Sequence, residues 1–380
     1  MELNATQLQE KWNPVLEAAD AGSITDSHKR AVTAIVLENQ EISLKEQSVA
    51  GGSDATGAIN NWDPVMISLV RRSTPNLLAF DVAGVQPMKG PTGLIFAMKS
   101  NYADGTSSTA PTEALFNEPN TSFSGKMSTA TAEGSTFAEM GFSIEKSTVT
   151  AESRQLKANY TMELAQDLKA VHGLNAESEL ASILSTEILG EINREMIQTM
   201  NTAAVPGANF DAAVGGSSGG RWEVEIYKNL ITHIDKEANA IAIATRRGKG
   251  NFAIISSNVA AALNATGNVQ YGNTANVSLA DVTGNLFVGT LNGGIKLYVD
   301  PFATSDYVTV GYKGTNSYDA GIFYCPYVPL SMMKTVGEND FQPRIGFKTR
   351  YGMTANPFTS NAADSNVYYR RSEERRVGKE

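Results

Sequence analysis

The clearest pattern of apolar and polar positions runs from Ala176 to Met200. Large apolar residues recur there every four positions, at Leu180, Leu184, Ile188, Ile192, Met196 and Met200. This spacing places them along one face of an α-helix. Asn175 suits the N-cap, and the acidic Glu177 and Glu179 suit the first turn. The pattern therefore predicts a helix ~37 Å long, with one buried face.

The segments around this helix predict a protein of mixed α and β structure. An extended arm at 146–160 and a short helix at 162–168 precede it, and a second amphipathic helix at 222–244 follows. Strand-like runs are expected at 93–98, 251–255, 286–289, 295–299, 307–310, 322–324 and 342–353, of which the first is expected to be buried. We expect the last run to return to the domain of the long helix.

Residues 1–46 form a separate pattern. Leu8 and Trp12 suggest one amphipathic helix, and Ala34 and Ile35 suggest a second. Small residues fill the following stretch, 48–57, which has no potential to form a core. A removable or docking segment fits this layout, and so does an ordinary N-terminal helical hairpin.

Residues 100–141 are rich in Ser, Thr, Ala and Gly, with isolated aromatic residues that include Phe116 and Phe123. A stretch so poor in core-forming residues predicts a long projecting loop that buries its aromatic side chains on another molecule. Disorder is the competing interpretation. Arg71 and Arg72 could bind an acidic partner, although solvated charges at a helix end are the usual explanation.

Composition narrows the function. The formal net charge of −9 argues against nucleic-acid binding as the main role, because contact with phosphates needs a basic face. The single cysteine, Cys325, excludes an internal disulfide and is expected to be buried. Neither a signal peptide nor a membrane-spanning segment is expected, so the sequence reads as soluble and made in a cytoplasm. Residues 371–380, nearly all charged, are expected to form a solvated tail.

The sequence contains no recognisable pattern of catalytic residues. The three histidines, His28, His172 and His233, belong to no metal-ligand pattern. Carboxylate pairs on helix faces suit solvated or inter-subunit charges better than acid–base catalysis. The glycine-rich stretch 212–221 lacks the ending of a phosphate-binding loop, and the basic loop 245–250 is weak evidence for DNA contact. We expect no catalytic residues, no cofactor and no metal. The alternative from another class is a cytoplasmic α/β enzyme, which requires a polar pocket.

Several separate motifs, in the same order, resemble the major capsid proteins of T-even-type tailed phages. The resemblance covers nearly all of the chain from Asn61 to Arg371. Its most specific parts are Val70–Leu77, Phe80–Met88, Pro91–Gly93, Ser153–Gly173, Glu191–Glu195, Val310–Gly314 and Gly346–Gly352.

The resemblance implies an α+β fold of the Hong Kong 97 type. Its expected parts are a cleavable segment at 1–46, an N-terminal arm at 47–92, an extended loop at 93–141, a peripheral domain with the long spine helix at 142–221, an axial domain at 222–330, a return to the peripheral domain at 331–370 and the charged tail at 371–380. The span between Phe123 and Phe137 is too short for the insertion domain that some relatives carry there.

The resemblance also implies a function. Such subunits form hexamers of an icosahedral head that encloses DNA, and a prohead protease removes their N-terminal segment. Leu44 and Glu46 match its recognition pattern, so cleavage is expected between Glu46 and Gln47. An earlier cut is expected after Leu8-Gln9-Glu10.

The implied partners are other copies of the chain, the capsid vertex protein, the protease, the scaffold, decoration proteins and, weakly, the packaged DNA. Inter-subunit contacts are expected at Arg71, Arg72, Phe116 and Phe123. The pentameric vertex paralogue of the same fold is the main alternative, and a nanocompartment shell is a lesser one.

Overall fold

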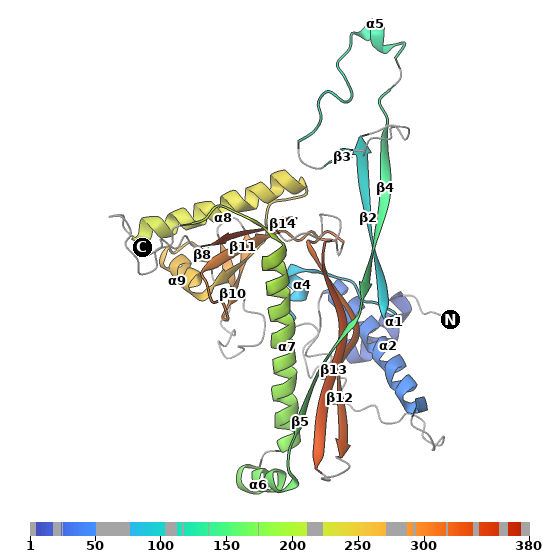
Figure 1. The fold of residues 1–380 in the computed structure, drawn as a ribbon, viewed down its shortest axis with the longest axis vertical. Helices are drawn as coiled ribbons and strands as arrows, with labels where there is room; N and C mark the ends of the chain where they lie inside the picture. Colours follow the sequence, from blue (N-terminus) through green and yellow to red (C-terminus); the bar gives the residue numbers. More distant parts are fainter. Residues whose placement is uncertain are drawn as a thin grey trace.

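The long helix, α7 (Ala176–Ala203), lies between two sheets in a computed structural model of the chain (Figure 1). The Asn175 side chain caps it by accepting a hydrogen bond from the Glu177 N–H. The predicted apolar stripe is buried from Leu184 to Met200. The structure describes residues 5–17, 24, 26–50, 77–102, 112–115, 118–135, 137–173, 175–210, 223–270, 287–291, 294–316, 318–336, 342–356 and 364–373.

A four-stranded sheet packs on one side of α7. Its order is β1-β12-β13-β5, in which β1 runs parallel to β12 and the other pairs are antiparallel. Ile345 and Phe347 of β13 share a buried core with Ile188 and Ile192 of α7. The strands are β1 (Gly84–Val85), β5 (Glu152–Asn159), β12 (Ile322–Val336) and β13 (Pro343–Ala355).

A seven-stranded sheet, in the order β6-β14-β11-β7-β10-β9-β8, packs on the other side. Strand β7 is buried on both faces: Ile254 joins the α7 core, whereas Ile255 joins a second core that includes Ile234 of α8. The strands are β6 (Ala204–Pro206), β7 (Phe252–Ser256), β8 (Val269–Gln270), β9 (Phe287–Leu291), β10 (Ile295–Asp300), β11 (Tyr307–Gly311) and β14 (Asn366–Glu373), and the helices that cover them are α8 (Glu223–Thr245) and α9 (Ser257–Ala265).

A long ribbon projects away from both sheets (Figure 1). It pairs β2 (Thr92–Tyr102) antiparallel with β4 (Met140–Thr150), and β3 (Thr112–Ala114) adds a short edge. The four residues of α5 (Thr129–Ala132) lie near its tip. Strand β4 runs almost directly into β5, so the predicted extended arm is in fact two strands of two different sheets.

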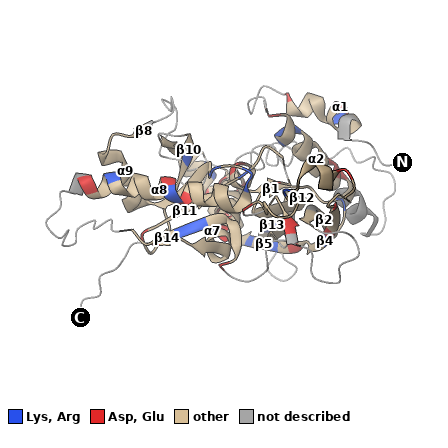
Figure 2. Ribbon diagram, turned by 90° about the horizontal axis from the view of Figure 1, so that it is seen from above, with Lys and Arg blue, Asp and Glu red and all other residues tan. Residues whose placement is uncertain are grey.

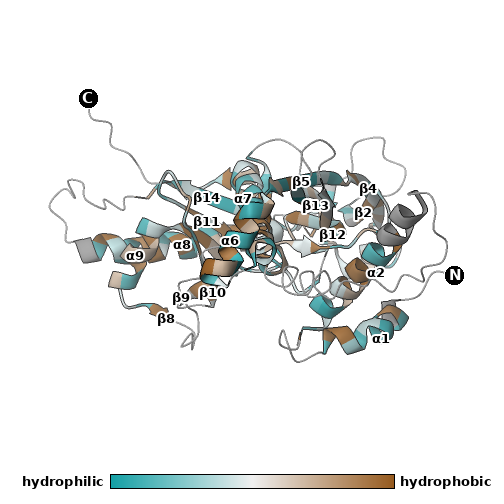
Figure 3. Cartoon of the chain, turned by 90° about the horizontal axis from the view of Figure 1, so that it is seen from below, coloured by the Kyte–Doolittle hydropathy of each residue, from teal (hydrophilic) through white to brown (hydrophobic). Residues whose placement is uncertain are grey.

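Shorter helices complete the described chain. Helices α1 (Ala5–Leu16) and α2 (Ser27–Ala50) lie together beside β12, and hydrophobic segments are visible on both (Figure 3). Helix α4 (Ala79–Val82) precedes β1, and α6 (Met162–His172) leads into α7 through Gly173, whose φ of 67° suits glycine. Among the described helices, none has the length and apolar character to cross a membrane.

The structure corrects three predictions. Residues 371–373 are not a solvated tail but the end of β14, where Ser372 pairs with Val308 of β11. Strand β14 belongs to the seven-stranded sheet and not to the four-stranded sheet that holds β12 and β13, so the expected return at 331–370 is wrong from residue 366 onward. Strand β12 starts at Ile322 in the four-stranded sheet, so residues 322–330 do not share the seven-stranded sheet with the strands expected beside them at 251–310. Pairing between strands distant in sequence decides all three boundaries.

Candidate assembly interface

The β2–β4 ribbon has one apolar face that nothing in the described chain covers. In its antiparallel register Leu94 pairs with Thr148, Phe96 with Lys146, and Ser100 with Phe142. Because side chains alternate between the two faces of a strand, the even-numbered residues of both strands share one face. The large apolar residues described on that face are Leu94, Phe96, Met140, Phe142 and Ile144.

These side chains are exposed to a degree that is unusual for apolar residues of their size. Phe142 is 71% exposed, Ile144 65% and Phe96 53%. The opposite face carries Ser143 and Glu145 along β4 and is apolar only at its base. There, Ile95 and Val149 are buried against the core that holds the ribbon to β12. A contiguous exposed apolar strip of this kind marks an interaction surface.

The sequence-based prediction of a buried strand at 93–98 is wrong for this face. Leu94 and Phe96 are exposed, whereas Ile95 between them is buried. The contribution of Phe142 and Ile144 was missed, although their alternation with Ser143 and Glu145 is a two-residue pattern visible in the sequence. A strand periodicity is therefore present where the composition predicts a long projecting loop.

Of the four residues predicted to contact other subunits, the structure describes one, Phe123. Phe123 lies against Tyr102 of the same ribbon, with ring centroids 4.8 Å apart. Arg71, Arg72 and Phe116 lie outside the described residues. The highly exposed Phe137, at 88%, extends the apolar character of the projecting segment.

The predicted cleavage site lies near the end of helix α2. The helix continues to Ala50, four residues beyond Glu46, so the backbone at Leu44, Glu46 and Gln47 is helical. The side chains of these three residues are outside the described part of the structure.

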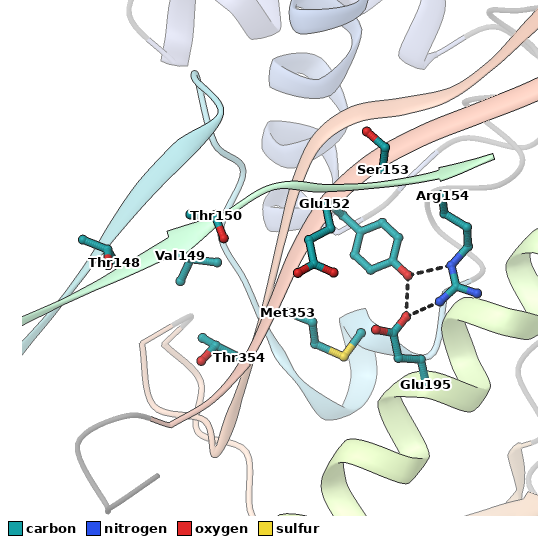
Figure 4. A pocket seen from close by; sticks show the side chains of 10 residues that line it. Thr148, Val149, Thr150, Glu152, Ser153, Arg154, Glu195, Met353 and Thr354 are labelled. Atoms are coloured by element: carbon teal, nitrogen blue, oxygen red, sulfur yellow. Dashed lines mark hydrogen bonds and ion pairs between the residues drawn. The ribbon is translucent and has the colours of Figure 1, made fainter.

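A charged cluster fastens the base of the ribbon to the spine helix (Figure 4). Arg154 of β5 forms ion pairs with Glu191 and Glu195 of α7, each at 2.5 Å. Tyr351 of β13 donates a hydrogen bond to Glu195 and accepts one from Arg154 Nε. The cluster thus joins three of the motifs that carry the resemblance.

The electrostatics of this cluster suit a structural role. Burial lowers the pKa of Arg154, but its hydrogen bonds and charges from Glu191, Tyr351 and Glu195 raise the pKa above its ordinary value overall. Burial, followed by the hydrogen bond to Glu195, raises the pKa of Tyr351, which therefore remains a neutral donor. Cluster residues Arg154, Glu195 and Tyr351 line an open cavity of about 400 Å³. Arg154 therefore holds both carboxylates of the spine helix in ion pairs.

A second ion pair joins α7 to the seven-stranded sheet. Arg194 Nη1 lies 2.5 Å from Asp300 Oδ2, at the end of β10, and Asp300 is 1% exposed. Tyr307 donates a hydrogen bond to the same carboxylate at 2.6 Å. The Glu191–Glu195 turn of the spine therefore holds one sheet through its glutamates and the other through Arg194.

Other candidate chemistry also receives a structural explanation. Cys325 is 2% exposed, and burial raises the pKa of its thiol to about 12, so it is a buried core residue and not a nucleophile. Within the described ranges, no group of three His, Cys, Asp or Glu side chains is placed to hold a metal ion. Acidic and basic residues are scattered over the elements in Figure 2.

Comparison with known proteins identifies the family. The model of the family "Major capsid protein Gp23" matches residues 59–138 and 126–373. The chain belongs to this family. The major capsid protein of Salmonella phage ViI is 39% identical, over 95% of this chain and 93% of its own length. That of Enterobacteria phage T4 is 35% identical, over 94% of this chain and 93% of its own.

A more distant relative and a solved structure complete the comparison. The capsid vertex protein of Enterobacteria phage T4 is 31% identical, but over only 62% of this chain and 58% of its own. The capsid of Myoviridae phage XM1 aligns with a TM-score of 0.46 at 10% identity, over 78% of this chain and 92% of the other. Membership of the Gp23 family, together with the α+β arrangement, agrees with the fold class expected from the sequence.

Proposed function

We propose that this chain is the major building block of an icosahedral tailed-phage head, assembled from many copies of itself. The observation that most directly supports this proposal is the exposed apolar face of the β2–β4 ribbon in a chain of the Gp23 family. Phe142 and Ile144 on this face are more than half exposed, and another copy of the chain that covers them removes their apolar surface from water. Contacts of this kind between identical subunits build symmetric assemblies. The chain then acts in the virion capsid and needs no catalytic site.

The subunits are proposed to form hexamers. The match to capsid vertex proteins covers 62% of the chain, against 95% for the first major capsid protein, and this favours the hexameric role over the pentameric one. The vertex protein is then a neighbour in the same shell. Counting subunits per capsomer in electron micrographs distinguishes the two roles.

Maturation is proposed to involve a prohead protease that cuts between Glu46 and Gln47. The family-model match starts at residue 59, downstream of this bond, which supports a distinct N-terminal segment. Because the bond lies in helix α2, the end of this helix must unwind before a protease can bind it in an extended form. N-terminal sequencing of the chain from mature particles tests this, and a start at Met1 contradicts it.

The remaining partners follow from the same proposal. A scaffold assists assembly, and decoration proteins bind the finished shell. Contact with DNA is weak, because the chain carries a net charge of −9. Tight, salt-sensitive DNA binding by the mature subunit in a mobility-shift assay contradicts this part.

The test of self-assembly is truncation of the apolar face. In the double variant Phe142→Ala and Ile144→Ala, each interface loses two side chains that contribute about 1.5–3 kcal/mol apiece when buried. We expect folded monomers that fail to form particles in electron micrographs. Glu145→Ala, on the opposite face of the same strand, is the matched control and should assemble. Normal assembly of the double variant would refute the role of this face.

A further inference from the structure

The two N-terminal helices are seated on the body of the protein by specific contacts. The Asn39 side chain of α2 donates hydrogen bonds to the Met88 carbonyl at 2.7 Å and to the Tyr327 carbonyl at 3.0 Å. Asn39 itself is 7% exposed. These two carbonyls belong to the chain that leaves β1 and to strand β12, so one side chain ties α2 to both.

Apolar and charged contacts extend the same surface. Trp12, Val36 and Leu37 are at most 3% exposed and share the main core with Phe80 and its neighbours in α4. Lys29 Nζ lies 3.7 Å from the Asp81 carboxylate. The same ammonium group lies 5.5 Å from the centre of the Phe80 ring. The contacts therefore continue along α2 from Lys29 to Asn39.

The helices also hold each other. Lys11 of α1 lies 2.7 Å from both Glu38 and Glu41 of α2. The Trp12 indole N–H donates to Glu38 at 3.1 Å. Burial lowers the pKa of Lys11, but its hydrogen bonds to the two glutamates raise the pKa overall, so the charge is retained. The helices thus form one unit with an interface to the rest of the chain.

We infer that helix α1 and residues 27–42 of α2 form a separable cover over the surface formed by residues 77–88 and Tyr327, held by its own contacts and able to stay bound after the backbone between residues 42 and 77 is cut. The contacts from Lys29 to Asn39 lie upstream of any such cut, and so does the pairing of α1 with α2. Hydrolysis of one peptide bond in that region breaks none of them.

This inference deepens the proposed function, on which its meaning in maturation rests. If the cover stays seated after proteolysis, the surface beneath it becomes available only when the cover dissociates. Proteolysis and exposure of the surface are then two separate steps. The first makes the second dependent on concentration, because a dissociated cover is no longer tethered at high effective concentration.

The experiment uses the full chain with a site-specific protease sequence in place of residues 52–58. After complete cutting, the mixture passes through size-exclusion chromatography at micromolar concentration and in dilution. We expect the N-terminal fragment to elute with the body. Asn39→Ala should weaken this association by about tenfold, because the buried Met88 carbonyl and the part-buried Tyr327 carbonyl lose their donor. Glu10→Ala, at an exposed position of α1, is the control and should leave the association unchanged.

A second measurement keeps the test decisive if Asn39→Ala folds poorly. A fluorescent peptide of residues 1–50 is added in excess to the cut, otherwise unaltered protein, and its exchange onto the body is followed by anisotropy. Saturable uptake supports the inference. Immediate separation of the cut pieces, absence of uptake, or an equal affinity in a folded Asn39→Ala variant overturns it. Particle formation is scored separately by electron microscopy, so failure of the cover is distinguishable from failure of the shell function.

Discussion

Removing Arg194 should destabilise the protein more than neutralising Asp300, although both changes break the same ion pair. The two partners differ in burial: the side chain of Arg194 is 30% exposed and that of Asp300 only 1%. In Arg194→Met, the carboxylate keeps only the neutral donors Tyr307 and the Phe302 N–H. In Asp300→Asn, the guanidinium keeps the Phe302 carbonyl and reaches water.

The magnitudes follow from this asymmetry. Breaking a buried pair by removing one partner costs about 3–5 kcal/mol, and the remaining donors place Arg194→Met near the lower end, at about 3 kcal/mol. Asp300→Asn loses a charge-assisted hydrogen bond but strands no buried charge, so about 1–2 kcal/mol is expected. The difference between the two variants should thus be about 1–2 kcal/mol.

Urea unfolding of the monomer at pH 7, followed by circular dichroism, measures both free energies of unfolding. Lys169→Met, an exposed cation on α6, is the matched control and should stay within about 0.5 kcal/mol of the parent protein. A loss in Asp300→Asn equal to or greater than that in Arg194→Met would refute the reasoning. The burial of Asp300 would then not determine how much free energy of unfolding is lost.

Three further outcomes are expected. Burial lowers the pKa of Lys313 from 10.5 to about 8, so its charge destabilises the fold below pH 8. The free energy of urea unfolding should therefore rise between pH 8 and 10.5, as the charge is lost from the folded state first. Lys313→Gln should remove this rise, and a rise of the same size in the variant contradicts the assignment. Cys325, with its pKa raised by burial to about 12, should resist maleimide at pH 7.5 in the folded protein and react in urea, as read by mass spectrometry; labelling of the folded form contradicts it. Gly311→Ala should lower the unfolding free energy by about 1–3 kcal/mol, because the new methyl group meets the Phe252 ring and lies 2.7 Å from Tyr369; Gly134→Ala, which has open space, is the control.

Local patterns in the sequence predicted the elements whose burial repeats at short range. The four-residue spacing from Leu184 to Met200 was sufficient to predict α7 and its buried face, because neighbouring turns of one helix form the stripe. The two N-terminal helices were visible for the same reason. The sequence left open whether they form a docking segment or an ordinary hairpin, and the structure shows a hairpin docked on the body.

Tertiary structure alone decided which distant segments meet. Arg154 lies 37 residues from Glu191 and 41 from Glu195, and no local pattern indicates that these three charges form one cluster. Residues 371–373 read as a charged tail because their neighbours in sequence are charged. Their strand forms because β11 offers a partner edge, with Thr309 opposite Arg371.

The apolar face of the ribbon shows what the sequence determines and what depends on the tertiary structure. The alternation at Phe142 and Ile144 is written in the sequence, but it does not say whether those side chains are buried or exposed. That depends on whether another layer covers the strand, and within the described chain none does. Sequence therefore determined the periodicity of each element, because periodicity is a property of one segment. Burial and partners belong to the tertiary structure, because each requires a second surface at the right distance.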